Sequence, residues 1–247
     1  MNSILDQTPS LQSDLAPRDG NSYVKGPEVP PLAYTSISKL LRDAAKRYGS
    51  REALIFPNNR LNYDDFDQTV DALAAGFLAL GLDKGDRLGI WSPNRLEWVL
   101  TQFATARIGV LLVNINPAYR LSELEYSLNT VGCKAIVLAQ SLKSSNYLQM
   151  IRTLAPEIDD CRQGKLHSIK LPQLRHVIVM GNVDGFDGLW SFDDILTLGG
   201  PIHRKQLSEI EQKLKPDDAI NIQFTSGTTG QPKGATLSHY NIVNNAH

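Results

Sequence analysis

The sequence AINIQFTSGTTGQPKGATLS occupies residues 219–238, and the interpretation of the whole chain depends on it. Residues 219–224 predict a β-strand. The residues that follow combine three glycines, one proline and four hydroxyl side chains, so the strand cannot continue and we expect a loop. Residues 234–237 predict a second, short strand, and Ser238 is placed to cap a helix directly after it.

The loop has the composition of a phosphate-binding site. Glycine lets backbone N–H groups approach a ligand without a Cβ in the way, hydroxyl groups add hydrogen-bond donors, and Lys233 adds a positive charge. The alternative is a flexible hairpin tip without a ligand, but the complete run, with Pro232 and Lys233 in fixed places, favours phosphate binding. The candidate phosphate-binding residues are Thr225, Ser226, Gly227, Thr228, Thr229, Gly230, Gln231, Pro232 and Lys233.

This loop differs from the common P-loop of nucleotide-binding proteins. The P-loop motif has glycine where Pro232 stands and serine or threonine where Gly234 stands, and a helix begins at once. Here a strand is expected after the loop, so the loop joins two strands. For Lys233 itself, the alternative to a phosphate ligand is a solvated surface charge.

Length and composition indicate a soluble globular protein that binds a small molecule. The 247 residues are 42% hydrophobic and 21% charged, which is ordinary for a globular chain with a large core. The formal net charge is -1, from 25 basic and 26 acidic residues, so nothing argues for nucleic acid as a partner. No apolar run approaches the length of a membrane span, and we expect no transmembrane segment. The pattern does not predict an oligomeric state.

No metal site is expected from the cysteines and histidines. Cys133 and Cys161 stand in no CxxC or Cys/His pattern, and free thiols in a reducing compartment are the simplest interpretation. The five histidines show no spacing typical of zinc ligands. Asp217 and Asp218, just before the first strand of the hairpin, are interpreted as turn formers rather than metal ligands.

Residues 1–35 are expected to form a flexible arm. They contain five prolines, several serines and aspartates, and no sustained periodicity. A secretory signal would need a basic start and an apolar core, and neither is present. Asp6, Asp14 and Asp19 accompany the lone Arg18, which argues against a mitochondrial presequence.

From Ser36 onward, strands and helices alternate, which predicts an α/β fold with mixed sheets flanked by helices. The expected strands are residues 52–56, 60–63, 87–91, 110–113, 135–138, 176–180, 219–224 and 234–237. The expected helices are residues 37–48, a helix capped by Asp64 or Asp65 that ends before Gly81, a helix opened by Ser92–Asn94 that runs to Ile108, a helix with Ser122 and Glu125 as capping box, residues 145–154 and residues 203–215.

Three polar or aromatic residues follow the strand at 110–113. Asn114, Asn116 and Tyr119 lie at its carboxyl end, where open sheets tend to bind ligands, but they form no motif and receive no role. Trp91 and Trp98 are interpreted as core residues, because aromatic side chains at such spacings most often pack in the interior.

Residues 224–234 resemble, without departure, the phosphate-loop signature of the adenylate-forming (AMP-binding) superfamily, which contains acyl-CoA synthetases, luciferases and peptide-synthetase adenylation domains. Residues 61–63 with the helix after them resemble its first core motif, and residues 103–117 its second. The resemblance extends from about Ser22 to His247. Within the superfamily, residues 219–245 and 103–120 are most similar to the medium-chain acyl-CoA synthetases of the family member 2 type.

The resemblance implies a two-step ligase. A carboxylate oxygen of a medium-chain fatty acid would attack the α-phosphorus of ATP to give acyl-AMP and pyrophosphate, and the thiol of CoA would then displace AMP. Thr225 to Lys233 would hold the β- and γ-phosphates, while Mg²⁺ offsets their charge. The resemblance also implies the mitochondrial matrix, with the cytosol as the alternative because the amino end has no clear transit peptide.

The resemblance covers only part of a ligase. The family's segments for adenine, ribose and the catalytic lysine would all follow His247, so no catalytic residue is assigned. We expect residues 36–247 to be the first part of a truncated AMP-binding N-terminal domain, without the C-terminal domain and unable to turn over alone. The second hypothesis is a non-catalytic nucleotide- or partner-binding module derived from such a ligase.

Overall fold

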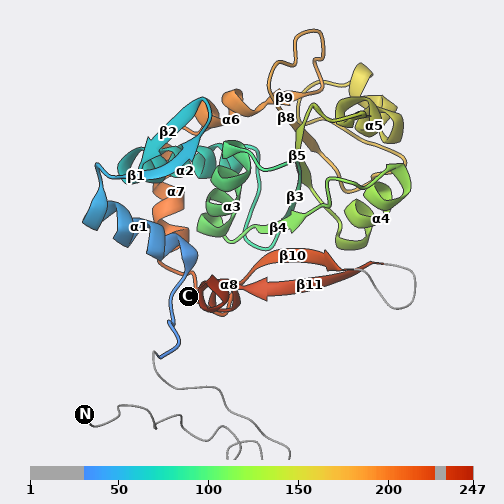
Figure 1. Cartoon of the computed structure of the whole chain (residues 1–247). Helices are drawn as coiled ribbons and strands as arrows, with labels where there is room; N and C mark the ends of the chain where they lie inside the picture. Colours follow the sequence, from blue (N-terminus) through green and yellow to red (C-terminus); the bar gives the residue numbers. More distant parts are fainter. Residues whose placement is uncertain (1–30, 226–231, 247) are drawn as a thin grey trace, which may run out of the picture. The chain divides into compact units, whose positions relative to one another are not determined.

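In the computed structural model, which describes residues 31–225 and 232–246, the strands of the main sheet lie in the order β11-β10-β4-β3-β5-β8-β9 (Figure 1). Neighbouring strands are parallel from β10 to β9, and β11 runs antiparallel to β10. The strands of this sheet are β3 (Arg87–Trp91), β4 (Leu111–Asn114), β5 (Ala135–Ala139), β8 (His176–Met180), β9 (Trp190–Ser191), β10 (Ala219–Thr225) and β11 (Lys233–Ser238). The expected α/β class with a mixed sheet is confirmed.

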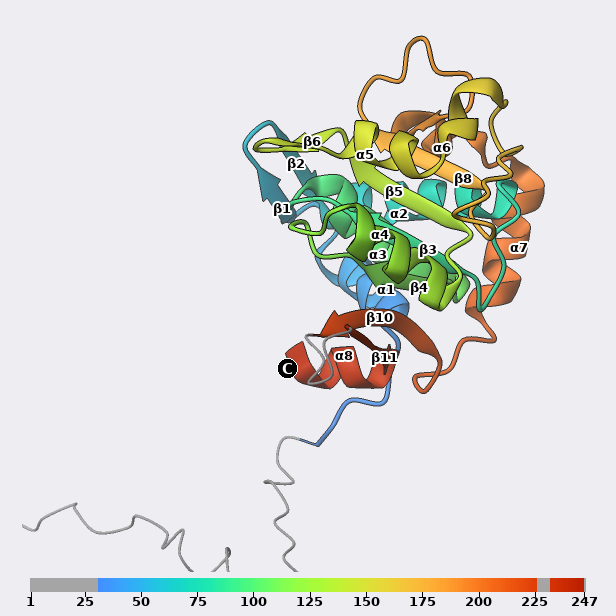
Figure 2. The same cartoon turned by 90° about the vertical axis from the view of Figure 1, so that its right-hand side faces the viewer.

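Helices cover both faces of this sheet. Figures 1 and 2 show α4 and α5 on one face and α1, α2, α3 and α7 on the other. Near one edge of the sheet, α8 lies beside β11 and also contacts α1. The helices are α1 (Ile37–Tyr48), α2 (Tyr63–Ala79), α3 (Leu96–Ile108), α4 (Leu121–Val131), α5 (Tyr147–Leu154), α6 (Phe192–Leu198), α7 (Pro201–Glu211) and α8 (His239–Ala246), with a 3-10 turn at Pro156–Asp160.

The central strands are apolar because both of their faces are covered. Every residue of β5 and of β8 is buried, as is typical of parallel strands between two helix layers. Trp91 at the end of β3 is fully buried and stacks on Tyr147, with 3.8 Å between the ring centroids. The prediction that Trp91 is a core residue is confirmed.

Helix ends agree with the sequence at α1 and α8 and differ at α2 and α4. α1 spans Ile37–Tyr48, as the sequence predicts, and Ser36 caps it by accepting a hydrogen bond from Lys39 N at 3.1 Å. The cap of α2 is Asn62, whose side chain accepts from Asp65 N at 2.7 Å, so the prediction of Asp64 or Asp65 was wrong. The helix begins earlier because the short side chain of Asn62 reaches the free N–H groups of its first turn.

At α4 the predicted capping box was also wrong. The helix begins at Leu121, and Glu123 rather than Glu125 accepts the hydrogen bond that closes the first turn, from Arg120 N at 3.1 Å. Ser122 therefore lies inside the helix, and its hydroxyl donates to the Glu123 carboxylate at 3.1 Å. The end of this helix at Gly132 is left-handed, with φ of 63°, a conformation that favours glycine.

Other boundaries shift by a few residues. The helix expected from Ser92 begins at Leu96, β4 is Leu111–Asn114 rather than 110–113, and α7 ends at Glu211 rather than at 215. The helix expected from Ser145 begins at Tyr147, because Ser145 pairs with Leu142 in a small hairpin. Two hairpins lie outside the main sheet and consist of β1 (Glu52–Phe56), β2 (Asn59–Asn62), β6 (Ser141–Leu142) and β7 (Ser145–Asn146).

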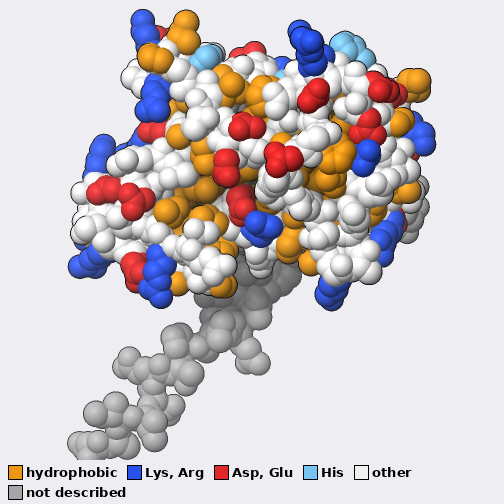
Figure 3. Space-filling view, turned by 90° about the horizontal axis from the view of Figure 1, so that it is seen from above, with side chains coloured by type: hydrophobic (Ala, Val, Ile, Leu, Met, Phe, Trp, Pro, Cys, Tyr) orange, Lys and Arg blue, Asp and Glu red, His pale blue; other side chains and the backbone are white. Residues whose placement is uncertain are grey.

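The surface of the described residues agrees with the charge balance of the sequence. Figure 3 shows basic and acidic side chains mixed over one face of the molecule. None of the described helices is both long enough and apolar enough to span a bilayer. The expected arm at residues 1–35 falls almost entirely outside the described residues and stays a prediction.

A cluster of charges around the buried Arg107 joins four helices. Arg107 on α3 has a fully buried side chain and pairs with Asp67 and Asp71 on α2, each at 2.7 Å. Arg42 on α1 contacts the same two carboxylates and also Glu211 on α7, at 3.0 Å. Burial of Asp71 disfavours its charged form, but the hydrogen bond from Arg42 and the charge of Arg107 outweigh burial and lower its pKa.

We predict that Arg107→Ala destabilises the fold by about 3–5 kcal/mol, because two half-buried carboxylates lose a buried partner. Urea unfolding followed by circular dichroism measures the change. Lys39→Ala is the control, since Lys39 makes an exposed pair with Asp43 and should cost under about 0.5 kcal/mol. Equal unfolding midpoints for the two variants would contradict the prediction.

A buried histidine joins α8 to α1. His239 is fully buried, and its Nδ1 accepts a hydrogen bond from Ile37 N at 3.3 Å. Its Nε2 has no hydrogen-bond partner among the described residues. Burial lowers the pKa of His239 to about 4, so the ring is neutral in the folded protein at pH 7.

Because the folded pKa of His239 lies below its ordinary value, its contribution to stability is complete above about pH 6.5 and is lost towards pH 4. We predict that it accounts for about 1–2 kcal/mol of the stability lost between pH 7 and pH 5. Urea unfolding of His239→Asn at the two pH values should show a smaller difference than the parent. His167→Asn, at an exposed position, should behave like the parent; an unchanged difference in His239→Asn would refute the assignment.

Candidate functional site

The hairpin of β10 and β11 is the structural basis of the candidate site. Its two strands are antiparallel, with Phe224 opposite Gly234 and Thr225 opposite Lys233. A Cβ on Gly234 would lie 3.0 Å from the Ile222 side chain, so a larger residue there would require Ile222 to shift slightly. The prediction that the loop joins two strands, unlike a P-loop, is therefore confirmed.

Three of the predicted phosphate-binding residues are described. Thr225 ends β10, Lys233 begins β11, and Pro232 immediately precedes Lys233. The predictions for Ser226, Gly227, Thr228, Thr229, Gly230 and Gln231 lie outside the described residues.

The open end of the hairpin presents a hydroxyl and a cation. Thr225 and Lys233 are both exposed, and Thr225 Oγ1 donates to the Lys233 carbonyl at 3.4 Å. The Lys233 ammonium group has no hydrogen bond or ion pair with any residue of the described ranges. An exposed ammonium group without a partner in the described residues can attract an anion.

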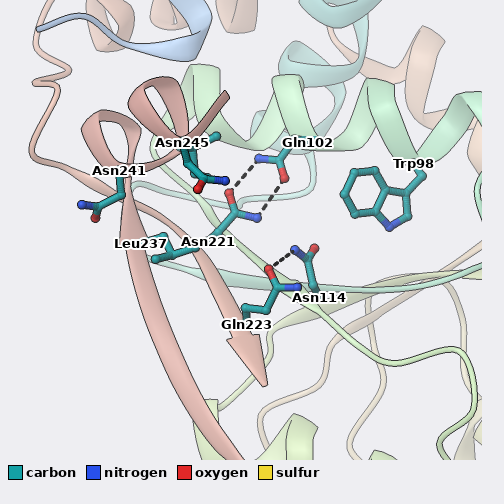
Figure 4. Close-up of a pocket in the computed structure, with 9 residues that line it drawn as sticks. Trp98, Gln102, Asn114, Asn221, Gln223, Leu237, Asn241 and Asn245 are labelled. Atoms are coloured by element: carbon teal, nitrogen blue, oxygen red, sulfur yellow. Dashed lines mark hydrogen bonds between the residues drawn. The ribbon is translucent and has the colours of Figure 1, made fainter. Parts of the chain in front are cut away.

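A cavity of about 540 Å³ lies next to the hairpin, between α3, β4, β10 and α8 (Figure 4). Its polar lining consists of side-chain amides rather than charges. Gln102 and Asn221 form a reciprocal pair, in which Gln102 Nε2 donates to Asn221 Oδ1 at 2.9 Å and Asn221 Nδ2 donates to Gln102 Oε1 at 2.8 Å. The residues that line the cavity are Trp98, Gln102, Asn114, Asn221, Gln223, Leu237, Asn241, Ile242 and Asn245.

A second cavity, of about 390 Å³, adjoins the first and lies at the carboxyl ends of β3, β4 and β10. Trp98, Asn114 and Gln223 line both cavities. In open α/β sheets this edge is where ligands bind. Trp98 therefore lines a cavity as well as packing against the core, so its interpretation as a core residue alone was incomplete.

One acceptor in this region lacks a partner. Asn114 Nδ2 donates to Gln223 Oε1 at 3.5 Å, but the buried Asn114 Oδ1 accepts no hydrogen bond within the described part of the chain. A buried acceptor of this kind favours a ligand with a hydrogen-bond donor. Nearby, burial raises the pKa of Tyr119, and the Glu123 carboxylate raises it further, so the phenol stays neutral at physiological pH.

The described part of the site presents polar groups and one cation, and no His, Cys, Asp or Glu lines either of its two cavities. Neither β10 nor β11 contains an Asp or Glu. Within residues 31–225 and 232–246, no group of three His, Cys, Asp or Glu side chains is arranged to hold a metal ion. Asp218 instead accepts hydrogen bonds from Lys215 N at 2.8 Å and Lys84 Nζ at 2.7 Å, in agreement with the turn predicted there.

The sequence pattern does not indicate Gln102 or Asn221 as site residues. One signal is present in the sequence, because the polar Asn221 stands between Ile220 and Ile222 in a strand. In the structure, Asn221 is only 1% exposed. A buried amide must find a partner, but the sequence does not say that this partner is Gln102, 119 residues away. Asn114 and Asn116, noted at a strand end, do line the cavities.

Comparison with known families identifies the chain. Residues 41–247 match the family model described as AMP-binding enzyme. The chain belongs to this family. The resemblance inferred from residues 224–234 is confirmed.

Two AMP-binding relatives are similar over nearly the whole chain. Medium-chain acyl-CoA ligase ACSF2, mitochondrial, from Danio rerio is 45% identical over 245 residues, which cover 98% of this chain and 39% of that ligase. The Homo sapiens protein of the same name is 45% identical over 235 residues, which cover 94% of this chain and 38% of that ligase. The chain therefore spans well under half the length of the curated relatives it matches.

A solved structure has a similar fold. MbtA from Mycobacterium smegmatis, in its apo form, superposes with a TM-score of 0.69 and 26% identity. The match covers 87% of this chain and 36% of MbtA. The expected fold, that of the N-terminal part of an adenylate-forming enzyme, is confirmed.

We predict that Asn221→Ala destabilises the AMP-binding fold by about 1–3 kcal/mol, because the Gln102 amide loses both hydrogen bonds. Gln102→Ala should cost a similar amount, and the double variant less than the sum, with a coupling of about 1 kcal/mol in urea unfolding. Asn245→Ala is the control, since this exposed amide lines the same cavity and should change stability by less than about 0.5 kcal/mol. Additive effects of Asn221→Ala and Gln102→Ala would show that the pair is not coupled.

Proposed function

We propose that this chain supplies the ATP-phosphate-binding part of an acid–thiol ligase that activates medium-chain fatty acids. In the first step the acid and ATP give acyl-AMP and pyrophosphate. In the second step CoA takes the acyl group, giving acyl-CoA and AMP. Residues 36–247 would form the first part of the AMP-binding domain, and the match to residues 41–247 supports this division.

The observation that carries the proposal is the open end of the hairpin. Thr225 and Lys233 lie opposite each other, exposed, on two strands held in register. Phe224, near the end of β10, lines a cavity at the carboxyl edge of the sheet. In the sequence, the Gly- and Thr-rich residues 226–231 connect Thr225 to Lys233. A polyphosphate needs several N–H and O–H donors and a cation, and this segment of sequence contains them.

The residues fit ATP better than they fit a metal ion. Lys233 and the hydroxyls of Thr225, Ser226, Thr228 and Thr229 would hold the β- and γ-phosphates, and Gly227 and Gly230 would allow the backbone to approach them. When bound, ATP supplies the AMP group that activates the acid. Mg²⁺ and CoA belong to the proposal as the family's cofactor and co-substrate, but the hairpin strands carry no carboxylate for Mg²⁺.

The medium-chain acid and the compartment rest on the relatives. Both ligases compared above are named for medium-chain acids and for the mitochondrion. We therefore propose a medium-chain fatty acid as substrate and the mitochondrial matrix as location, with the cytosol as the alternative. Imaging of the tagged chain together with a matrix marker tests the location.

We predict that Lys233→Ala weakens ATP binding about ten- to a hundredfold, because a charge-assisted contact to phosphate is lost. The exposed Lys233 side chain makes no contact that packing needs, so the urea midpoint should stay unchanged. Isothermal titration calorimetry with ATP measures the affinity. Lys213→Ala is the matched control. It also removes one exposed positive charge, but from a position before residues 224–234, and should leave the ATP affinity unaltered.

Equal ATP affinity in Lys233→Ala and the parent would remove Lys233 from the phosphate site. Exchange of labelled pyrophosphate into ATP that depends on a medium-chain acid would support the ligase and would contradict the expectation that this chain cannot turn over alone. ATP binding without exchange agrees with both functional hypotheses. The coding sequence after His247 separates them, since segments there for adenine and ribose and a catalytic lysine would support the ligase.

A further inference from the structure

A side chain from α4 contacts the hairpin of β10 and β11 at its open end. The Tyr126 hydroxyl on α4 donates a hydrogen bond to the Pro232 carbonyl at 3.3 Å. The ring of Tyr126 meets the ring of Phe224 edge-on, with centroids 6.5 Å apart and an interplanar angle of 61°. Phe224 lies on β10 and Pro232 just before β11, so one residue contacts both sides of the hairpin.

The helix that carries Tyr126 is anchored in the core. Leu124 and Leu128, two positions before and after Tyr126, are buried at 0% and 2% exposure. Ser127 ties the same turn by donating to the Glu123 carbonyl at 2.7 Å. Figure 1 shows α4 above the open end of the hairpin, on the face of the sheet opposite α3.

The hydroxyl and the ring contribute separately. The edge-on ring contact with Phe224 continues the core, because Phe224 also packs against buried residues. The hydrogen bond instead fixes the Pro232 carbonyl, which belongs to the peptide bond between Pro232 and Lys233. That carbonyl belongs to a proline, which has no N–H of its own to anchor it in a strand ladder.

We propose that Tyr126 is a positioning residue for polyphosphate binding, which acts by fixing Pro232 and thereby the backbone from which Lys233 extends. The inference rests on the proposed function, that this hairpin binds the phosphates of ATP. The β10–β11 pairing already holds Thr225 opposite Lys233, and Tyr126 adds a contact from α4 to Pro232, which lies just outside that pairing. A lysine whose backbone is fixed loses less freedom when it meets an anion, and therefore binds it more tightly.

The test compares Tyr126→Phe with the parent chain by calorimetry, using ATP and AMP as ligands. Tyr126→Phe keeps the ring and removes only the hydroxyl. We expect the ATP dissociation constant to rise about three- to tenfold, and the ratio of the AMP to the ATP dissociation constants to fall by the same factor. The urea midpoint should not change.

Tyr34→Phe is the matched control. The Tyr34 hydroxyl also donates one hydrogen bond within the chain, to Asp217 Oδ2 at 2.5 Å. This contact is exposed, and Asp217 lies before β10. Tyr34→Phe should leave both nucleotide affinities unchanged. Tyr126→His, which keeps a ring and a donor, should recover part of the affinity lost in Tyr126→Phe.

Three outcomes would overturn the inference. ATP affinity in Tyr126→Phe equal to that of the parent would show that the hydroxyl positions nothing. A fall in the affinities for ATP and AMP by the same factor, together with a lower urea midpoint, would reduce Tyr126 to a packing residue. A parent chain that does not bind ATP would overturn the proposed function, and this inference with it.

Discussion

The pairing of β10 with β4 is the constraint on which the site depends. Residues 221–223 of β10 pair in parallel with residues 112–114 of β4, although more than 100 positions separate them in the sequence. This pairing brings the end of β10 to the carboxyl edge of the sheet and places Gln223 beside Asn114. β11 then returns antiparallel, so Thr225 and Lys233 face each other at that edge. The cavities, the amide pairs and the open end of the hairpin all follow from one backbone register.

The charged and aromatic contacts fix the helices around that register. Arg107 and Arg42 join α1, α2, α3 and α7 through shared carboxylates on one face of the sheet. On the other face, Tyr126 connects α4 to both sides of the hairpin. The two sets of contacts differ in kind, since the ion pairs join charged side chains of four helices, whereas the Tyr126 hydroxyl bonds a backbone carbonyl next to Lys233.

Local signals in the sequence predict local structure well and distant partners poorly. Glycine, proline and hydroxyl residues predict the strand–loop–strand at 219–238 because turn chemistry is a property of neighbouring residues. The cap of α2 was misplaced because Asn62, Asp64 and Asp65 are all good capping residues, and only the backbone path decides among them. The partners Gln102 and Tyr126 are not predictable, because the fold brings them to β10 and Pro232 from 119 and 106 positions away.

The amide pair of Gln102 and Asn221 also determines which alignments of β10 the fold can tolerate. Sliding this strand by a single position along its neighbour would exchange the inward and outward side chains. Ile220 or Ile222 would then face the Gln102 amide, and Asn221 would turn its polar group towards apolar neighbours with nothing to bond. A misaligned sheet would thereby leave both amides without partners, so the pair favours the observed register of β10 with β4.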